Sequence, residues 1–180
     1  MREENTKLSR FLSMILRHHP EVIGIELDSH GWADIDRLIE GVNRSGKYID
    51  RDLLEKIVAE DKKQRYSISP DKKCVRANQG HSVHVDVELS EERPPDILYH
   101  GTAEKYVDSI EKKGLLPRGR LYVHLSRDRE TAISVGRRHG SPIVYRIDSQ
   151  RMYLDGISFY RSENDVWLVK YVPFEYMIME

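Results

Sequence analysis

The chain has 180 residues, of which 39% are hydrophobic and 33% are charged, with a formal net charge of -1. This composition excludes a disordered chain, and the absence of a long apolar run in the sequence excludes a membrane-spanning helix. The near-neutral charge argues against coating of nucleic acid by a bulk positive field, so any contact with RNA requires a local cluster of cations.

The start of the chain and its cysteine content indicate a reducing compartment. Met1–Asn5 is polar and leads into an amphipathic pattern, so the apolar core of a secretory signal is lacking. A single cysteine, Cys74, allows neither an intrachain disulfide nor a cysteine-based zinc site. We therefore expect a cytoplasmic protein.

The first predicted element is an amphipathic helix over Leu8–Arg17, where apolar residues recur at spacings of three and four. Thr6 is the predicted cap. Pro20 stops the helix, because the residue before a proline disfavours helical geometry. Arg17 and His18 therefore lie at or just past the last turn, where cations complement the helix dipole.

Short elements follow this helix. Val22–Leu27 and Trp32–Ala33 are predicted to form a strand pair around a turn at Asp28–Gly31. Helical spacing then predicts one helix over Ile35–Val42 and another that begins after Asp50.

A predicted hairpin completes the first half of the chain. Arg65–Ile68 and Cys74–Ala77 flank a turn, and helices followed by a hairpin suggest a winged-helix-like lobe. Because Pro94 and Pro95 cannot continue a helix or a central strand, we place the lobe boundary there, with lobes over 1–92 and 93–180.

The second lobe mixes strands and helices, which gives an α+β fold class. The predicted elements are strands over Ile97–His100, Leu121–Leu125, Ile143–Arg146 and Val166–Val169, and helices over Ala103–Lys112 and Arg129–Arg137.

Four cationic residues are candidates for chemistry: Arg17 and His18 at the helix end, and Arg65 and Arg120 at strand starts. Each alone is as readily explained as a helix cap or a solvated surface charge. If folding brings them to one cleft, their guanidinium groups could hold a phosphate dianion in bidentate fashion.

Two strands carry polar residues at their ends. In Ile97–Thr102, Gly101 could let a ligand approach the main chain, and the helix that follows could offer free N–H groups to an anion. An ordinary strand-to-helix turn is the alternative. The polar residues of Tyr122–Ser126 could likewise share one face or simply lie in water.

Two further polar stretches have simpler interpretations. Arg76–Ser82 could contact RNA or serve as a polar connector, and Arg137–Gly140 is typical of a helix C-terminus with cations and a glycine stop. The histidines show no paired helical spacing with a carboxylate, so the sequence does not support a catalytic metal.

Taken together, these stretches resemble the RNA 2'-phosphotransferase family, NAD-dependent enzymes that finish tRNA splicing in fungi and have bacterial and archaeal relatives. The resemblance runs almost end to end. The matching pieces are Leu12–Pro20, Asp28–Asp36, Arg65–Ile68, Arg76–Ser82, Leu98–Thr102, Tyr122–Ser126, Val135–Pro142 and Val166–Leu168.

The resemblance implies a winged-helix-like RNA lobe and an ADP-ribosyltransferase-like NAD lobe, with the active site in the cleft between them. The implied catalytic set is Arg17, His18, Arg65 and Arg120. His100, Gly101, Thr102 and Ser126 are implied to bind NAD, and Lys63, Arg76 and His81 are the candidate RNA contacts.

The implied reaction has two steps. The RNA 2'-phosphate attacks the nicotinamide ribose carbon, and the ribose 2''-hydroxyl then attacks that phosphate, which yields 2'-hydroxyl RNA and ADP-ribose 1'',2''-cyclic phosphate. The late glutamate of many ADP-ribosyltransferases is not evident in Asn164–Trp167. Many relatives have glycine where Asp165 stands, so this chain places an extra acid near the expected phosphate.

Two other functions remain open at this point. The chain could transfer ADP-ribose to terminal phosphates of nucleic acid or to a protein, in which case no cyclic phosphate forms. It could instead be a non-catalytic winged-helix module that binds RNA without NAD+. In each case we expect a monomer, because the sequence shows no surplus of apolar surface.

Overall fold

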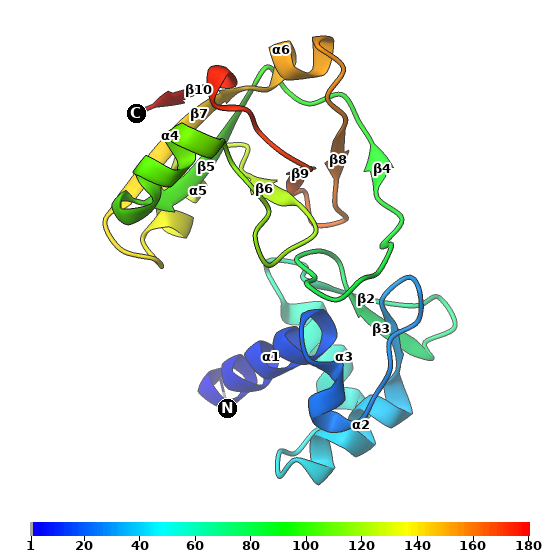
Figure 1. Cartoon of the computed structure of the whole chain (residues 1–180). Helices are drawn as coiled ribbons and strands as arrows, with labels where there is room; N and C mark the ends of the chain where they lie inside the picture. The colour runs from blue at the N-terminus through cyan, green and yellow to red at the C-terminus, as the bar shows by residue number, and fades with distance from the viewer. Residues whose placement is uncertain (1) are drawn as a thin grey trace. The chain divides into compact units, whose positions relative to one another are not determined.

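The computed structural model describes residues 2–180, with side chains described from Thr6 onward. The chain divides into two compact units, the first ending at Glu88 and the second spanning Leu89–Glu180. Each unit combines helices with an antiparallel sheet, which confirms the predicted α+β class (Figure 1). The boundary predicted after Glu92 lies a few residues beyond the division between the two units, which follows Glu88. Ser90–Glu91 already pairs with a strand of the second unit.

The first unit contains three α-helices and one sheet. Its elements are α1 (Arg2–Arg17), the 3-10 helix η1 (Pro20–Ile23), β1 (Trp32–Asp34), α2 (Ile35–Arg44), α3 (Arg51–Glu60), β2 (Tyr66–Ile68) and β3 (Cys74–Ala77). The strands form a three-stranded antiparallel sheet in the order β1-β3-β2.

Local capping explains where two of these helices begin. The Asp34 carboxylate accepts a hydrogen bond from the backbone N–H of Arg37 at the start of α2, and Asp50 accepts one from Leu53 at the start of α3. These caps lie where the sequence predicted helix starts. Both helices and the β2-β3 hairpin are therefore confirmed.

Two predictions for the first unit are wrong. Thr6 does not cap α1, because the helix begins at Arg2 and no residue before Thr6 disfavours helical backbone strongly enough to delay it. Val22–Leu27 does not pair with Trp32–Ala33. Instead Pro20 opens a 3-10 turn, and β1 takes β3 as its partner.

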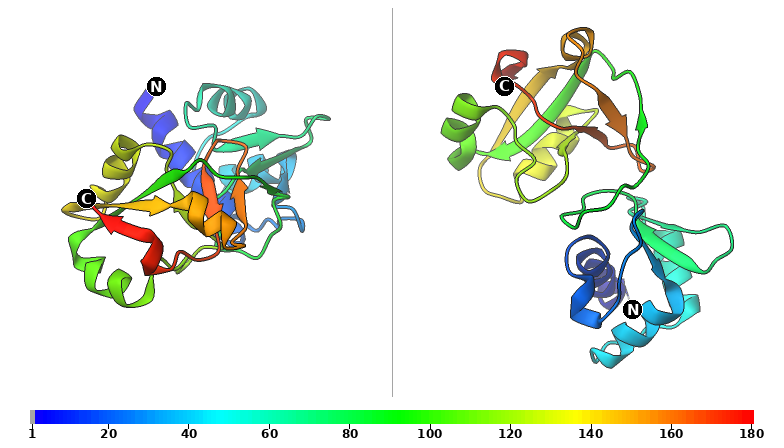
Figure 2. Two further views of the ribbon diagram at one scale, coloured as in Figure 1. Left: turned by 90° about the horizontal axis from the view of Figure 1, so that it is seen from above. Right: turned by 45° about the vertical axis from the view of Figure 1, so that its right-hand side comes forward.

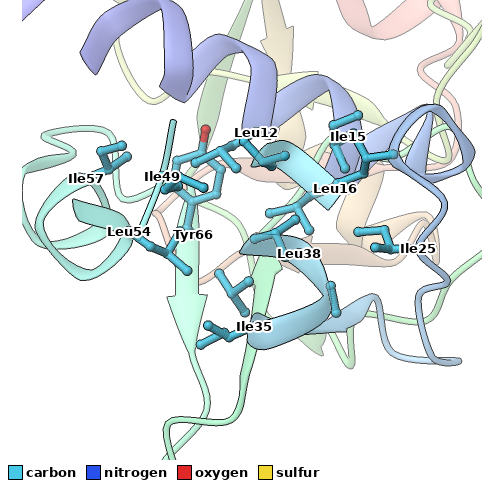
Figure 3. Packing of buried hydrophobic residues seen from close by; sticks show 14 of the residues in the cluster. Leu12, Ile15, Leu16, Ile25, Ile35, Leu38, Ile49, Leu54, Ile57 and Tyr66 are labelled. Atoms are coloured by element: carbon cyan, nitrogen blue, oxygen red, sulfur yellow. The ribbon is translucent and has the colours of Figure 1, made fainter. Parts of the chain in front are cut away.

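One apolar core joins the three helices to the sheet. Leu12 and Leu16 of α1 and Leu38 of α2 are fully or almost fully buried in it (Figure 3). Tyr66 of β2 enters the same core with its hydroxyl group toward α1, where it donates to the carbonyl oxygen of Ser9 at 2.6 Å. The middle of α1 is thus fixed against β2.

The second unit is built from two antiparallel sheets, ordered β10-β7-β5 and β4-β8-β9-β6. Its strands are β4 (Ser90–Glu91), β5 (Ile97–Ala103), β6 (Val123–Leu125), β7 (Pro142–Asp148), β8 (Phe159–Arg161), β9 (Trp167–Val169) and β10 (Met177–Met179). Its helices are η2 (Glu104–Tyr106), α4 (Val107–Lys113), α5 (Arg129–Gly136), α6 (Ser149–Leu154) and η3 (Phe174–Tyr176).

The predicted strands and helices of this unit are present with altered bounds. Figure 2 shows β7, in yellow to orange, beside the green strand β5. The predicted helix over Ala103–Lys112 begins later, since β5 continues through Ala103 and η2 precedes α4. Within residues 2–180, no helix is long and apolar enough to span a membrane, and no three His, Cys, Asp or Glu side chains gather closely enough to hold a metal ion.

Candidate active site

The C-terminal end of α1 carries Arg17 and His18, and loop 78–82 lies directly against it. The carbonyl oxygen of Arg17 accepts a hydrogen bond from the backbone N–H of Ser82 at 3.0 Å. The hydroxyl oxygen of Ser82 lies 2.9 Å from Nδ1 of His18. A hydroxyl group can donate or accept, so this contact restrains the orientation of the His18 ring whichever ring nitrogen carries the proton. Ser82 is therefore placed to orient the imidazole ring of His18.

Asn78 ties the same loop to strand β2. Its backbone N–H donates to the carbonyl oxygen of Arg65 at 2.8 Å, and its side-chain oxygen accepts from the Ser67 hydroxyl at 2.7 Å. Gly80 has a φ of 90°, and a Cβ atom at this position would lie 3.6 Å from Nη1 of Arg17. The loop thus connects the segment that bears Arg65 to the helix end that bears Arg17.

His81 is the most deeply buried residue of this loop, with 2% of its surface exposed against 4% for Asn78. Burial and, after it, the positive charges of Arg17, His18 and Arg76 lower the pKa of His81 to about 4. The ring is therefore neutral near pH 7 and adds no charge to the cations around it. Burial gives His81 a role inside the loop, and its contact with RNA stays a prediction.

Arg65 and Arg17 lie along one face of α1. The Arg65 guanidinium donates from Nη1 to Asp61 at 2.9 Å and to the Ser9 hydroxyl at 3.4 Å. Ser9, Ser13 and Arg17 follow one another at a spacing of four residues, so they share a face of the helix. The rise of an α-helix separates Ser9 from Arg17 by about 12 Å along the axis. An anionic ligand on this face of the helix could contact both arginine side chains.

The other two predicted RNA contacts differ in exposure. Arg76 is buried, with its guanidinium 4.5 Å from the centre of the Trp32 ring and Nη1 3.3 Å from the Glu88 carboxylate. These contacts give Arg76 a structural role, and its contact with RNA stays a prediction. Lys63, in contrast, is exposed in the turn between α3 and β2.

In the second unit, backbone contacts hold His100 and Ser126 on neighbouring segments. The backbone N–H of Ser126 donates to the carbonyl oxygen of Tyr99 at 2.7 Å, and Tyr99 donates back at 2.9 Å. Nδ1 of His100 lies 3.0 Å from the carbonyl oxygen of His124. Because a carbonyl oxygen can only accept, Nδ1 of His100 carries a proton.

Two side chains of the second unit, Arg120 and His139, act on His100 through their charges. Burial lowers the pKa of His100, and the positive charges of Arg120 and His139 lower it further, against the hydrogen bond to His124, which raises it. Desolvation and the charge of Arg138 also lower the pKa of Arg120. These effects place Arg120 and His139 within electrostatic range of His100, and Arg138 within range of Arg120.

Arg138 and His139 were missed as functional candidates by sequence reasoning. They belong to the Arg137–Gly140 stretch, whose cations were interpreted as complements of a helix dipole. The helix α5 does end at Gly136, so that interpretation fits its bounds. The sequence shows that Arg138 and His139 are adjacent. It does not show that they act electrostatically on Arg120 and His100, which depends on the fold.

Gly101 and Thr102 serve the packing of β5 against α5. A Cβ atom on Gly101 would lie 1.7 Å from the carbonyl oxygen of Ala132, and one on Gly136 would lie 2.6 Å from that of Thr102. The α5 backbone thus approaches Gly101 closely, which accounts for a glycine at this position. Strand β5 does not end at this glycine. A contact of these two residues with a cofactor stays a prediction.

Asp165 occupies a turn position that favours glycine. Its φ is 65°, in the left-handed region, where aspartate is better tolerated than most side chains. Its carboxylate pairs with Arg161 and lies 3.6 Å from Nη1 of Arg127. The extra acid is therefore neutralised locally, which explains how this chain carries it.

The sequence also matches a family model described as RNA 2'-phosphotransferase, Tpt1 / KptA family, over residues 3–171. The chain belongs to the RNA 2'-phosphotransferase family. This confirms the resemblance found in its motifs. The part matched by the RNA 2'-phosphotransferase model includes Arg17, His18, Arg65 and Arg120.

Similar proteins from three bacteria align with this chain over nearly their full lengths. A probable RNA 2'-phosphotransferase of Acaryochloris marina is 48% identical over 178 residues, covering 99% of this chain and 98% of that protein. One of Fusobacterium nucleatum is 49% identical over 176 residues, covering 97% and 98%. One of Flavobacterium johnsoniae is 47% identical over 170 residues, covering 94% and 93%.

Proposed function

We propose that this chain removes an internal 2'-phosphate from RNA, with NAD+ as co-substrate. Family membership supports the removal of a 2'-phosphate. The observation that carries the proposal is the linkage in the first unit, where loop 78–82 joins the helix end bearing Arg17 and His18 to the segment bearing Arg65. Guanidinium groups held in this way suit a phosphate, which offers several acceptor oxygens.

We also propose that the first unit is a winged-helix-like RNA lobe and the second an ADP-ribosyltransferase-like lobe. The first assignment is supported by three helices followed by a hairpin within a three-stranded sheet. The second is supported by two antiparallel sheets that meet at the pairing of Tyr99 with Ser126.

In the proposed first step, Arg17, Arg65 and Arg120 bind the 2'-phosphate. This phosphate is already anionic when it attacks the ribose carbon, so it needs positioning more than deprotonation. NAD+ supplies the electrophilic carbon, with nicotinamide as the leaving group. A guanidinium that is already fixed by a neighbour loses less freedom when it binds, and Arg65 is fixed in this way by Asp61.

The residues near His100 fit the ribose and phosphate groups of NAD+. His100 is neutral near pH 7 because its pKa is lowered, and its Nδ1 is occupied by the His124 carbonyl. Its remaining ring nitrogen is then an acceptor suited to a ribose hydroxyl. The cationic Arg138 suits the pyrophosphate. Ser126 adds a hydroxyl group on the segment beside His100.

In the proposed second step, the ribose 2''-hydroxyl of the 2'-phospho-ADP-ribosylated RNA attacks phosphorus, and the 2'-oxygen of the RNA leaves. The hydroxyl loses its proton and the departing oxygen gains one, so the step is balanced. Charge grows on the phosphate oxygens, where Arg17, Arg65 and Arg120 stabilise it. His18 orients the attacking hydroxyl or transfers the proton, with its ring held by Ser82.

For RNA contacts outside the phosphate site, we propose Lys63, because it is exposed beside Arg65. The other two predicted contacts are both buried: Arg76 lies in β3 over the Trp32 ring, and His81 lies within loop 78–82.

The test measures nicotinamide release and 2'-phosphate loss with the same RNA. We expect one nicotinamide for each 2'-phosphate removed, and a loss of at least about 100-fold in rate for Arg17→Ala, Arg65→Ala or Arg120→Ala. Arg44→Ala is the matched control, since Arg44 is exposed and pairs with the exposed Glu40 on the same helix. Nicotinamide release without loss of the 2'-phosphate would instead support ADP-ribosylation of another group.

A further inference from the structure

The carboxylate of Asp61 lies behind Arg65 and is largely removed from solvent. Its side chain is 8% exposed, against 31% for Arg65. One carboxylate oxygen accepts from Nη1 of Arg65 at 2.9 Å, and the other accepts from the backbone N–H of the same residue at 2.7 Å. A single carboxylate thus fixes both the main chain and the side chain of Arg65.

Asp61 also shapes the turn that leads to Arg65. It follows the last residue of α3, and its carbonyl oxygen accepts from the backbone N–H of Gln64 at 2.7 Å. Gln64 has a φ of 43°, in the left-handed region that non-glycine residues rarely enter. The turn therefore has a defined conformation, and Asp61 makes contacts at both of its ends.

The anchoring of Arg65 leaves one edge of its guanidinium for a ligand. Nη1 contacts Asp61 and the Ser9 hydroxyl. Among the side chains that the structure describes, from Thr6 onward, no hydrogen-bond acceptor meets Nε or Nη2 of Arg65, and neither atom is among the buried polar atoms that lack a partner. Because the five N–H groups form a rigid fork, fixing Nη1 fixes the direction of the Nε–Nη2 edge.

We propose that Asp61 is a positioning residue that makes the first unit selective for a 2'-phosphate over plain RNA. This inference rests on the proposed function, in which Arg65 binds that phosphate. Asp61 has two opposing effects on RNA. Its negative charge reduces the general attraction of this surface for the RNA backbone, and its hydrogen bonds aim the Arg65 fork at one added phosphate.

These opposing effects give the proposal a characteristic signature. Loss of the carboxylate frees the Arg65 side chain and also raises the local positive charge. Binding of RNA without a 2'-phosphate should therefore stay constant or become tighter, whereas binding of RNA with one should weaken. A residue that merely supported the fold would lower both affinities together.

The experiment uses the full chain without NAD+, so that no chemistry occurs, and two RNAs that differ only in one internal 2'-phosphate. For Asp61→Ala we expect the ratio of the two affinities to fall about tenfold, equivalent to about 1.4 kcal/mol. Asp61→Asn keeps the size of the side chain and should lower the ratio in the same direction. It provides the test if Asp61→Ala does not fold.

Asp50→Ala is the matched control. Asp50 caps the other end of α3, where it accepts from the backbone N–H of Leu53, and it makes no contact with Arg65. This variant should keep the wild-type affinity ratio. In an Arg65→Ala background, Asp61→Ala should produce no further fall in the ratio, because the side chain that it aims is gone.

The outcomes separate this proposal from the one on which it rests. If the wild type binds both RNAs equally, the proposed function fails and the role of Asp61 fails with it. If the wild type prefers the 2'-phosphate and Asp61→Ala and Asp61→Asn keep that preference, only the role of Asp61 is overturned. A parallel loss of both affinities also overturns it, in favour of a purely structural residue.

Discussion

The two units hold their candidate residues by different means. In the first unit, hydrogen bonds between side chains position the candidate residues. The bond between the Ser82 hydroxyl and the His18 ring is an example. In the second unit, main-chain groups position the candidate residues. The carbonyl oxygen of His124, which accepts a hydrogen bond from the His100 ring, is an example. Single substitutions can therefore alter one interaction in the first unit, whereas disturbing the second unit requires a change in strand packing.

The largest expected effect comes from Gly101→Ala, which tests whether strand and helix packing maintains the second unit. The added methyl group would lie 1.7 Å from a backbone oxygen of α5, so helix and strand must separate. We expect a loss of at least about 3 kcal/mol in the free energy of unfolding, measured by urea denaturation. Gly119→Ala is the control, because nothing lies within 4 Å of its added Cβ.

Acid should destabilise the first unit through His81. Its pKa is about 4 when folded, below the usual 6.5, so the unfolded chain binds a proton first as the pH falls. The stability that neutral His81 provides above pH 6.5 is then lost toward pH 4, by up to about 3 kcal/mol. His81→Gln should flatten this dependence.

The chain carries two tryptophans that separate the units in this measurement. Trp32 lies in the first unit and Trp167 in the second, so 5-fluorotryptophan gives one fluorine signal for each. His81→Gln should change the pH dependence of the Trp32 signal only. An unchanged slope at Trp32 would rule out His81 as the source.

Ser82→Ala tests the side-chain contacts of the first unit at His18. Loss of the hydroxyl removes the hydrogen bond to Nδ1. We expect the second step to slow about fivefold to tenfold, so that phospho-ADP-ribosylated RNA accumulates, and the nitrogen NMR shifts of His18 to change. Ser82→Thr keeps a hydroxyl and should restore the rate. If the second step kept its normal rate while the nitrogen shifts of His18 changed, a role of His18 in proton transfer would be contradicted.

The smallest expected effect is that of Asp165→Gly. Glycine adopts the φ of 65° without strain, but the ion pairs with Arg161 and Arg127 are lost. Since exposed ion pairs contribute little, we expect a change of less than about 1 kcal/mol in thermal unfolding. A larger loss would show that the ion pairs, and not the turn, maintain this loop.

Regular elements with strong periodicity were the part of the fold that could be predicted. Helices α2 and α3 begin at aspartate caps that are visible in the sequence, and the β2-β3 hairpin has a clear turn. In contrast β8 and β10 were not predicted, because short strands carry too few residues to show a period. The strand expected at Val22–Leu27 failed because pairing partners are chosen by tertiary contacts.

The candidate site was predictable as a set of residues but not as a set of contacts. Arg17 and Arg65 could be named from motifs, and the resemblance to the family is confirmed. No pattern in the sequence indicated that Asp61 fixes Arg65 or that Ser82 meets His18. The sequence left open whether Gly101 lets a ligand approach or lies in an ordinary strand-to-helix turn, and it did not show that the α5 backbone packs against this glycine.

The most direct test of the proposed function follows the phosphate itself. The protein is incubated with RNA that carries one radiolabelled internal 2'-phosphate, with and without NAD+, and the labelled products are separated by chromatography. We predict that label moves into ADP-ribose 1'',2''-cyclic phosphate, and only when NAD+ is present. Label released as inorganic phosphate without NAD+, or retained on the RNA with it, would contradict the proposed reaction.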